Sequence, residues 1–183
     1  MHERSHKKYL LIKTAVYLIL SVITFIFRYE LVERLNYFIG ALMIIYGAEE
    51  FLFEMMFYGK DFWKREKLFL GFVELIFGIF LVCAPIDIES TCVVWASWAI
   101  IRESYEIREL FVTVKRKVLS VVSGIESVLV IVLSFILILE AGARHAIIHT
   151  YLLLAELVLT PLIPLFDEFF TENGTTKTDE RQK

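Results

Sequence analysis

Residues 68–85 read LFLGFVELIFGIFLVCAP, an apolar run that contains a single acid, Glu74. Gly71 and Gly78 lie two helical turns apart in this run, so they share one face of a helix. Small residues on such a face let a neighbouring backbone approach closely, as helices in lipid require. A carboxyl group in hydrocarbon costs a few kcal/mol, so Glu74 needs a physical reason to be there. The run therefore predicts a membrane helix with a functional or packing role for its one acid.

The composition extends this interpretation to the whole chain. The chain has 183 residues, of which 57% are hydrophobic and 22% charged, and a mean hydropathy of +0.64. The apolar residues are concentrated in blocks, and about 20 such residues suffice to cross a bilayer. We predict an all-α, integral membrane six-helix bundle (residues 1–166) followed by a disordered polar tail (residues 167–183). The predicted spans are residues 9–27, 35–57, 68–85, 91–111, 118–139 and 146–165.

Lysine and arginine residues predict the orientation. They concentrate before the first span and in the second and fourth connections, as Arg4, Lys7, Lys8, Lys60, Lys64, Arg65, Lys67, Lys115, Arg116 and Lys117. Such residues stay on the cytoplasmic side during insertion. We therefore expect a multi-pass protein of the bacterial plasma (inner) membrane with both termini in the cytoplasm. Its partner is the lipid bilayer. The basic residues form no single surface, so nucleic acid is not an expected partner.

Five acids lie in the predicted spans, and they are Glu49, Glu74, Glu103, Glu126 and Glu156. The acids of the even spans, Glu49, Glu103 and Glu156, recur at an interval of roughly 50 residues, as do Glu74 and Glu126 of the odd spans. This interval indicates an internal repeat. Their spacing predicts three parallel helical hairpins, each an odd span, a short outer loop and an even span. At the helical rise per residue, all five acids fall in one layer in the cytoplasmic half of the bilayer. Ser21 stands where the first span would carry the sixth acid.

Two interpretations of this layer stay open. Protonated carboxyl groups can hydrogen-bond across helices and serve packing alone. Alternatively, the layer titrates or binds a small cation, as intramembrane acids often do. Arg102 is the only cation at this depth, and one guanidinium can hold two carboxylates. We predict that Arg102 is the hub of the layer, with Glu103 in its own helix and acids from other helices around it. Glu50 and Glu54 are expected at the cytoplasmic interface.

Histidine and cysteine residues give weaker signals. His145 and His149 are four residues apart and could bind a metal or sense external acid, but no third ligand accompanies them, so we expect polar surface residues. Cys83 and Cys92 flank a short outer loop, where a disulfide is conceivable and two small buried side chains are favoured. Pro161 and Pro164 are expected to end the last span. No metal site and no cofactor are predicted.

The segment Ile45-Tyr46-Gly47-Ala48-Glu49 and the glycine-spaced run 70–79 followed by Pro85 resemble the HdeD-like family of small bacterial inner-membrane proteins. The likeness covers roughly residues 10–165. It implies a six-span fold, an inner-membrane location and an association with acid resistance. The chain departs from the pattern in two ways. The third hairpin lacks the glycine pair, and Arg102 replaces the residue that corresponds to Ala48.

The sequence contains no phosphate-binding glycine loop, serine nucleophile elbow or metalloprotease motif, so we do not expect an enzyme. Three functions stay open. The first is a membrane stress protein, linked to acid tolerance, whose Glu/Arg cluster titrates or binds a small cation. The second is a transporter or channel-like module for a proton, ion or small solute. The third is a structural or scaffolding protein, and a homo-oligomer is compatible with each of the three.

Overall fold

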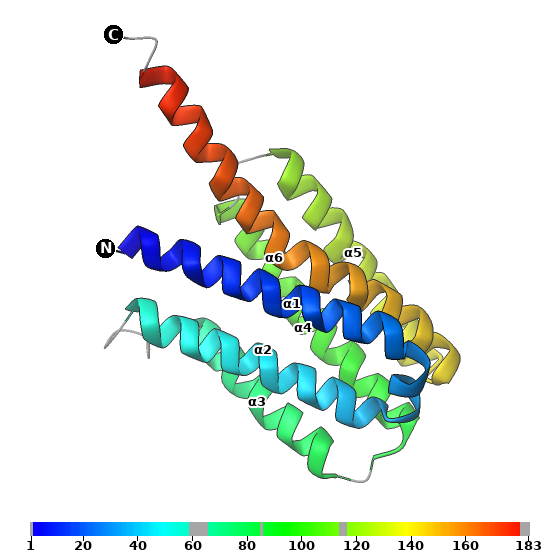
Figure 1. Ribbon diagram of the computed structural model, residues 1–183. Coiled ribbons are helices and arrows are strands. Elements are labelled where there is room, and N and C mark those ends of the chain that lie inside the picture. The colour runs from blue at the N-terminus through cyan, green and yellow to red at the C-terminus, as the bar shows by residue number, and fades with distance from the viewer. Residues whose placement is uncertain (1, 59–65, 85, 114–116, 180–183) are drawn as a thin grey trace. The chain divides into compact units, whose positions relative to one another are not determined.

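The computed structural model describes residues 2–58, 66–84, 86–113 and 117–179 (Figure 1). Within these ranges the chain is all-helical, and no strand is present. The helices are α1 (His2–Glu33), α2 (Leu35–Tyr58), α3 (Glu66–Cys83), α4 (Ile88–Thr113), α5 (Lys117–Leu139) and α6 (Ala143–Asp179). The predicted basic connections at 59–65 and 114–116, Pro85 and the end of the tail lie outside the described residues. The all-α prediction is confirmed.

The helix boundaries follow the predicted spans closely, with two differences at the ends of the chain. The first helix begins at His2 and continues to Glu33, beyond both predicted ends. The last helix runs through Pro161 and Pro164 to Asp179, so the prolines do not end it, and residues 167–179 are helical where a disordered tail was expected. A proline removes one backbone N–H and bends the axis, but its φ angle is itself helical, so the helix can resume after it.

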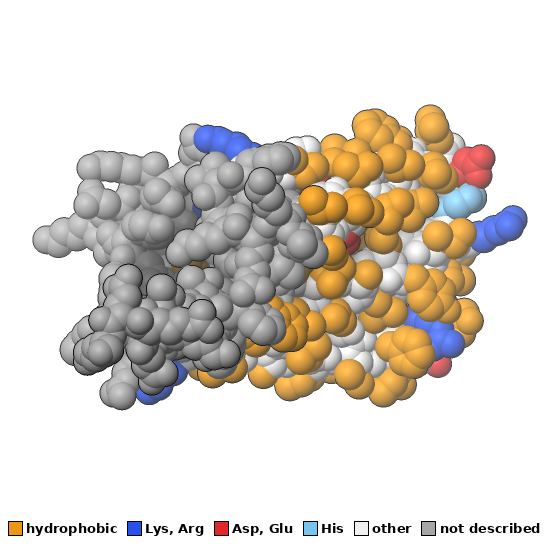
Figure 2. Space-filling model, turned by 90° about the horizontal axis from the view of Figure 1, so that it is seen from above, with side chains coloured by type: hydrophobic (Ala, Val, Ile, Leu, Met, Phe, Trp, Pro, Cys, Tyr) orange, Lys and Arg blue, Asp and Glu red, His pale blue; other side chains and the backbone are white. Residues whose placement is uncertain are grey.

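Within the described part of the chain, four helices are long and apolar enough to cross a membrane. These segments are Lys8–Glu33, Leu35–Phe53, Val121–Leu139 and Ala143–Phe166. The remaining helices, α3 and α4, carry more charge, including Glu74 in α3 and the adjacent Arg102 and Glu103 in α4. Hydrophobic side chains dominate the coloured surface in Figure 2. The structure thus supports a membrane protein in contact with lipid, while the number of spans stays a prediction.

The chain divides into two compact units. The first consists of Met1–Arg28, Glu103–Leu133 and Ile148–Lys183, and the second of Tyr29–Arg102 and Ser134–Ile147. In the first unit, Thr14 Oγ1 lies 2.8 Å from Leu10 O and 3.4 Å from Pro161 O, which joins α1 to α6. The second unit contains the packing of α2 along α3.

Glycines determine how closely α2 and α3 approach. A Cβ atom added to Gly40 would lie 2.8 Å from Gly78 O, and one added to Gly47 would lie 2.5 Å from Gly71 O. As the α2 residue number rises the α3 number falls, so the helices are antiparallel. The packing role predicted for Gly71 and Gly78 is confirmed, and Gly40 and Gly47 of α2 share it. The contact joins the second span of one predicted hairpin to the first span of the next, and the three-hairpin repeat itself stays a prediction.

Candidate functional site

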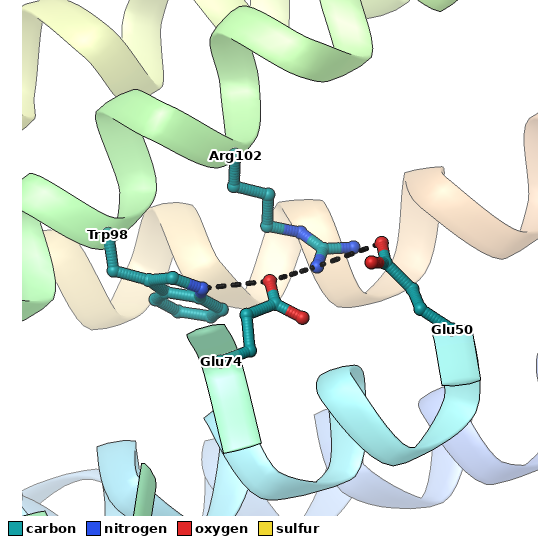
Figure 3. A network of polar contacts seen from close by, with 4 residues as sticks. All are labelled: Glu50, Glu74, Trp98 and Arg102. Carbon is teal, nitrogen blue, oxygen red and sulfur yellow. Dashed lines mark hydrogen bonds and ion pairs between the residues drawn. The ribbon is translucent and has the colours of Figure 1, made fainter. Parts of the chain in front are cut away.

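A network of buried polar side chains surrounds Arg102 in the second unit (Figure 3). Glu74 Oε1 accepts hydrogen bonds from Arg102 Nη1 at 3.0 Å and from Trp98 Nε1 at 2.9 Å. Trp98 and Arg102 are one turn apart on α4, so both side chains reach the same carboxylate on α3. The Glu74 side chain is fully buried and that of Arg102 is 5% exposed. Glu74 therefore has a cationic partner and a neutral donor on one oxygen.

Aromatic rings cover the guanidinium of Arg102. Its central carbon lies 3.7 Å from the centroid of the Tyr46 ring and 5.9 Å from that of Trp98. The two rings meet edge-on, with centroids 5.6 Å apart and an angle of 61° between their planes. A planar guanidinium can stack on a ring while its edge donates hydrogen bonds, which an ammonium group cannot do. The position of Arg102 is thus fixed both by an ion pair and by stacking.

Glu50 of α2 is the second carboxyl group of the network. Its Oε1 lies 3.8 Å from Arg102 Nη1, and its side chain is 14% exposed. A Cβ atom added to Gly71 would lie 3.2 Å from Glu50 Cβ and 3.6 Å from Glu50 Oε2. The Glu50 side chain therefore lies against the bare backbone of Gly71. Gly71 thus lets α2 and α3 approach each other and leaves space for the Glu50 side chain.

Two further charged groups act on this network. Glu49, which is half-buried, interacts electrostatically with Arg102 and with Lys67 of α3. Glu50 and Glu74 also act on Glu49, as like charges.

The two carboxyl oxygens of Glu74 differ in their hydrogen bonding, because Oε1 accepts both hydrogen bonds. Oε2 is buried and has no hydrogen-bond partner among the residues that the structure describes. In Figure 3 this oxygen lies on the side of Glu74 that faces Glu50. Burying a carboxyl oxygen without a donor is unfavourable, so the position is suited to a small positively polarised species.

The predicted acids divide between the two units. Glu49 and Glu74 belong to the second unit with Arg102, while Glu103, Glu126 and Glu156 belong to the first and are buried there. The structure thus brings Glu74 to Arg102 as expected from a hub, and the single layer of five acids stays a prediction. The contact of Glu50 with Arg102 was not predicted, and the interfacial position expected for Glu50 stays a prediction. No local signal in the sequence identifies this contact, because it depends on the antiparallel register that places Gly71 beside Gly47.

The histidine predictions need one correction. His145 Nε2 lies 3.1 Å from Glu140 Oε2 and is partly exposed, as expected of a surface residue. His149 is 3% exposed, so its assignment to the surface is wrong. The two histidines belong to different units. Across the described ranges, no group of three or more His, Cys, Asp or Glu side chains is arranged to hold a metal ion.

Both cysteines are free thiols. Cys83 is exposed, whereas Cys92 is buried and its Sγ lies 4.0 Å from Gly142 O. The interpretation as a small buried side chain holds for Cys92 alone, and the conceivable disulfide is not formed.

No family model matches the chain, and neither a curated protein nor a solved structure matches it.

Proposed function

We propose that this chain is an HdeD-like, six-span protein of the bacterial inner membrane whose Arg102 network binds one proton or one small monovalent cation. The observation that carries the proposal is the buried pair of Glu74 and Arg102, with Glu50 as a second carboxyl group on the same guanidinium. Binding of this kind fits a protein that responds to acid stress, as the resemblance implies.

The gathering of carboxyl groups supports a positively charged ligand. Glu50 and Glu74 both act on Glu49 as like charges. Like charges that lie close together in a low-dielectric interior favour the uptake of a positive charge by one of them.

The ion pair of Glu74 with Arg102 supports membrane insertion of α3 and α4. Glu74 and Arg102 stand in neighbouring helices and offset each other, as ionisable residues within membrane segments usually do. The outer face of α3 is apolar, with Phe69, Phe72 and Phe80 more than half exposed. Six spans with both termini in the cytoplasm fit these features and the distribution of basic residues.

A structural role is the second candidate. It is favoured by the full burial of Glu74 and by the stacking of Arg102 on Tyr46, both of which fix a helix-packing geometry. In that case the network would hold the helices together without any ligand.

The test is ligand binding by the full chain in lipid nanodiscs. Proton uptake by potentiometric titration and binding of radioactive sodium ions are measured for the wild type and for the Glu49→Gln/Glu50→Gln/Glu74→Gln triple variant. We expect about one proton or one sodium ion per chain in the wild type and a loss of that uptake in the triple variant. Glu140→Gln, at an exposed carboxyl group, is the matched control and should retain the uptake. A folded wild type that takes up neither ion would leave only the structural role.

A further inference from the structure

We infer that the ligand of the Arg102 network is a proton, that Glu50 is the carboxyl group that takes it, and that Gly71 is the residue that positions Glu50. This inference rests on the proposed function and specifies its ligand. It follows from the contacts of the Arg102 guanidinium, from the exposure of the Glu50 and Glu74 side chains and from the contact of Glu50 with Gly71.

The guanidinium argues against a metal cation. Arg102 Nη1 lies 3.0 Å from Glu74 Oε1 and 3.8 Å from Glu50 Oε1, so it already occupies the position between the two carboxyl groups. A metal cation bound to either carboxylate would lie close to this fixed positive charge and be repelled by it. Hard cations also need several oxygen ligands, and the described residues provide no suitable group of three. A proton needs only one oxygen.

Access distinguishes Glu50 from Glu74. The Glu74 side chain is fully buried, whereas that of Glu50 is 14% exposed. The carboxyl oxygen of Glu50 also lies farther from Arg102 Nη1 than that of Glu74, at 3.8 Å against 3.0 Å, so the guanidinium attracts it less. Of these two carboxyl groups, Glu50 is therefore the more accessible to a proton.

Binding of a proton to Glu50 changes the charges and the hydrogen-bond donors of the network. An O–H bond forms on the Glu50 carboxylate as a hydronium ion gives up its proton and becomes water, and the charge attraction between Glu50 and Arg102 is lost. The new O–H group is a donor, and Glu74 Oε2 is a buried acceptor in the same network. Arg102 of α4 and Glu49 of its own helix act on Glu50, and Glu74 and Lys67 of α3 act on Glu49 in turn. Glu50 is ionised at higher pH and neutral at lower pH.

Gly71 controls where the Glu50 carboxyl group lies. A methyl group at Gly71 would lie 3.2 Å from Glu50 Cβ and 3.6 Å from Oε2, tighter than ordinary packing at the first of these atoms. Gly71→Ala therefore displaces Glu50 relative to Arg102. Gly78→Ala is the matched control, because its added methyl group would meet Gly40 O at 2.7 Å and Ile44 instead. Both variants disturb the contact of α2 with α3, but only the first adds atoms beside Glu50.

The experiment is infrared difference spectroscopy of the full chain in lipid nanodiscs, titrated in pH. We expect a protonated-carboxyl band in the wild type at low pH that disappears as the pH rises. The band should be absent from Glu50→Gln and should persist in Glu49→Gln at a changed midpoint, since Glu49 also acts on the network. Gly71→Ala should shift the midpoint, and Gly78→Ala should leave it in place. If Glu50→Gln does not fold, Glu50→Asp keeps a carboxyl group and should shift the band.

Other outcomes separate this inference from the proposed function. A band that survives in Glu50→Gln but is lost in Glu49→Gln or Glu74→Gln assigns the proton elsewhere and overturns the inference alone. Sodium binding without any titrating band overturns it as well, while the proposed function stands. A wild type that takes up neither proton nor sodium overturns both.

Discussion

Gly47 and Gly71 face each other across α2 and α3 so closely that a Cβ atom on Gly47 would lie 2.5 Å from the carbonyl oxygen of Gly71. Such a distance leaves no room for any side chain, so this contact sets the separation of the two helices. Gly71 also lies against Glu50, whose carboxyl group is 3.8 Å from Arg102. The packing of α2 on α3 and the geometry of the charged network therefore share one residue.

Gly47→Ala should destabilise the protein. The added methyl group would meet the backbone of Gly71 and the side chain of Leu75. The backbone of Gly71 can move away only if the two helices separate. Overpacking of this kind costs about 1–3 kcal/mol. The free energy of unfolding in lipid, measured by steric trapping, checks this. Gly124→Ala is the control, because nothing lies within 4 Å of a Cβ atom there, and it should be neutral or stabilising. Equal stabilities of the two variants would contradict the packing role.

The sequence predicted the helices well because hydrophobic blocks, charges and glycine spacing are local signals. It identified Arg102 as a hub from its depth alone, but it could not choose Glu50 as a partner. Periodicity shows which residues share a face of one helix, whereas Glu50 meets Arg102 only through the antiparallel register of α2 and α3. The continuation of α6 past Pro164 was missed since the local effect of one proline is a single lost hydrogen bond. The burial of His149 likewise depends on tertiary packing.

Arg102→Met should be among the most destabilising single substitutions. It removes the counter-charge of the fully buried Glu74, and breaking a buried ion pair from one side costs about 3–5 kcal/mol. Glu74→Gln in the same chain should recover much of this loss, because the uncompensated charge is then absent. The free energies of unfolding of the two single variants and the double variant form a cycle that measures the coupling. Additive effects would show that the ion pair does not contribute as a unit.

Trp98→Phe tests the neutral donor of the network. Phenylalanine keeps an apolar ring but removes the indole N–H that donates to Glu74 Oε1 at 2.9 Å. A hydrogen bond to a charged group contributes about 1.5–3 kcal/mol, and the free energy of unfolding should fall by that order. In a Glu74→Gln background the same substitution should cost less. An unchanged cost in that background would show that the loss comes from ring packing.

Asp87 caps the start of α4 and predicts a pH dependence. Its Oδ1 accepts a hydrogen bond from the backbone N–H of Ser90 at 2.7 Å, and the Ser90 donors hold the pKa of Asp87 below its usual value of 3.8. Because the folded-state pKa is depressed, this stabilisation is present above the unfolded pKa and is lost as the pH falls through the folded one. The protection factor of the Ser90 amide against hydrogen exchange, which corrects for the intrinsic pH dependence of exchange, should therefore fall at low pH. Asp87→Asn keeps an N-cap oxygen and should abolish this pH dependence, whereas Asp87→Ala should expose the amide at every pH.

The two free thiols test the predicted orientation of the chain. Cys83 is exposed at the end of α3 that is predicted to lie outside, and Cys92 is buried. A membrane-impermeant maleimide added to intact cells should label the wild type once, and Cys83→Ser should abolish that labelling. Cys92→Ser should leave it unchanged, because a buried thiol does not react with a bulky reagent. Labelling of Cys83 only after the membrane is permeabilised would place this end of α3 in the cytoplasm. The termini would then lie outside, and the proton would reach Glu50 from the opposite side of the membrane.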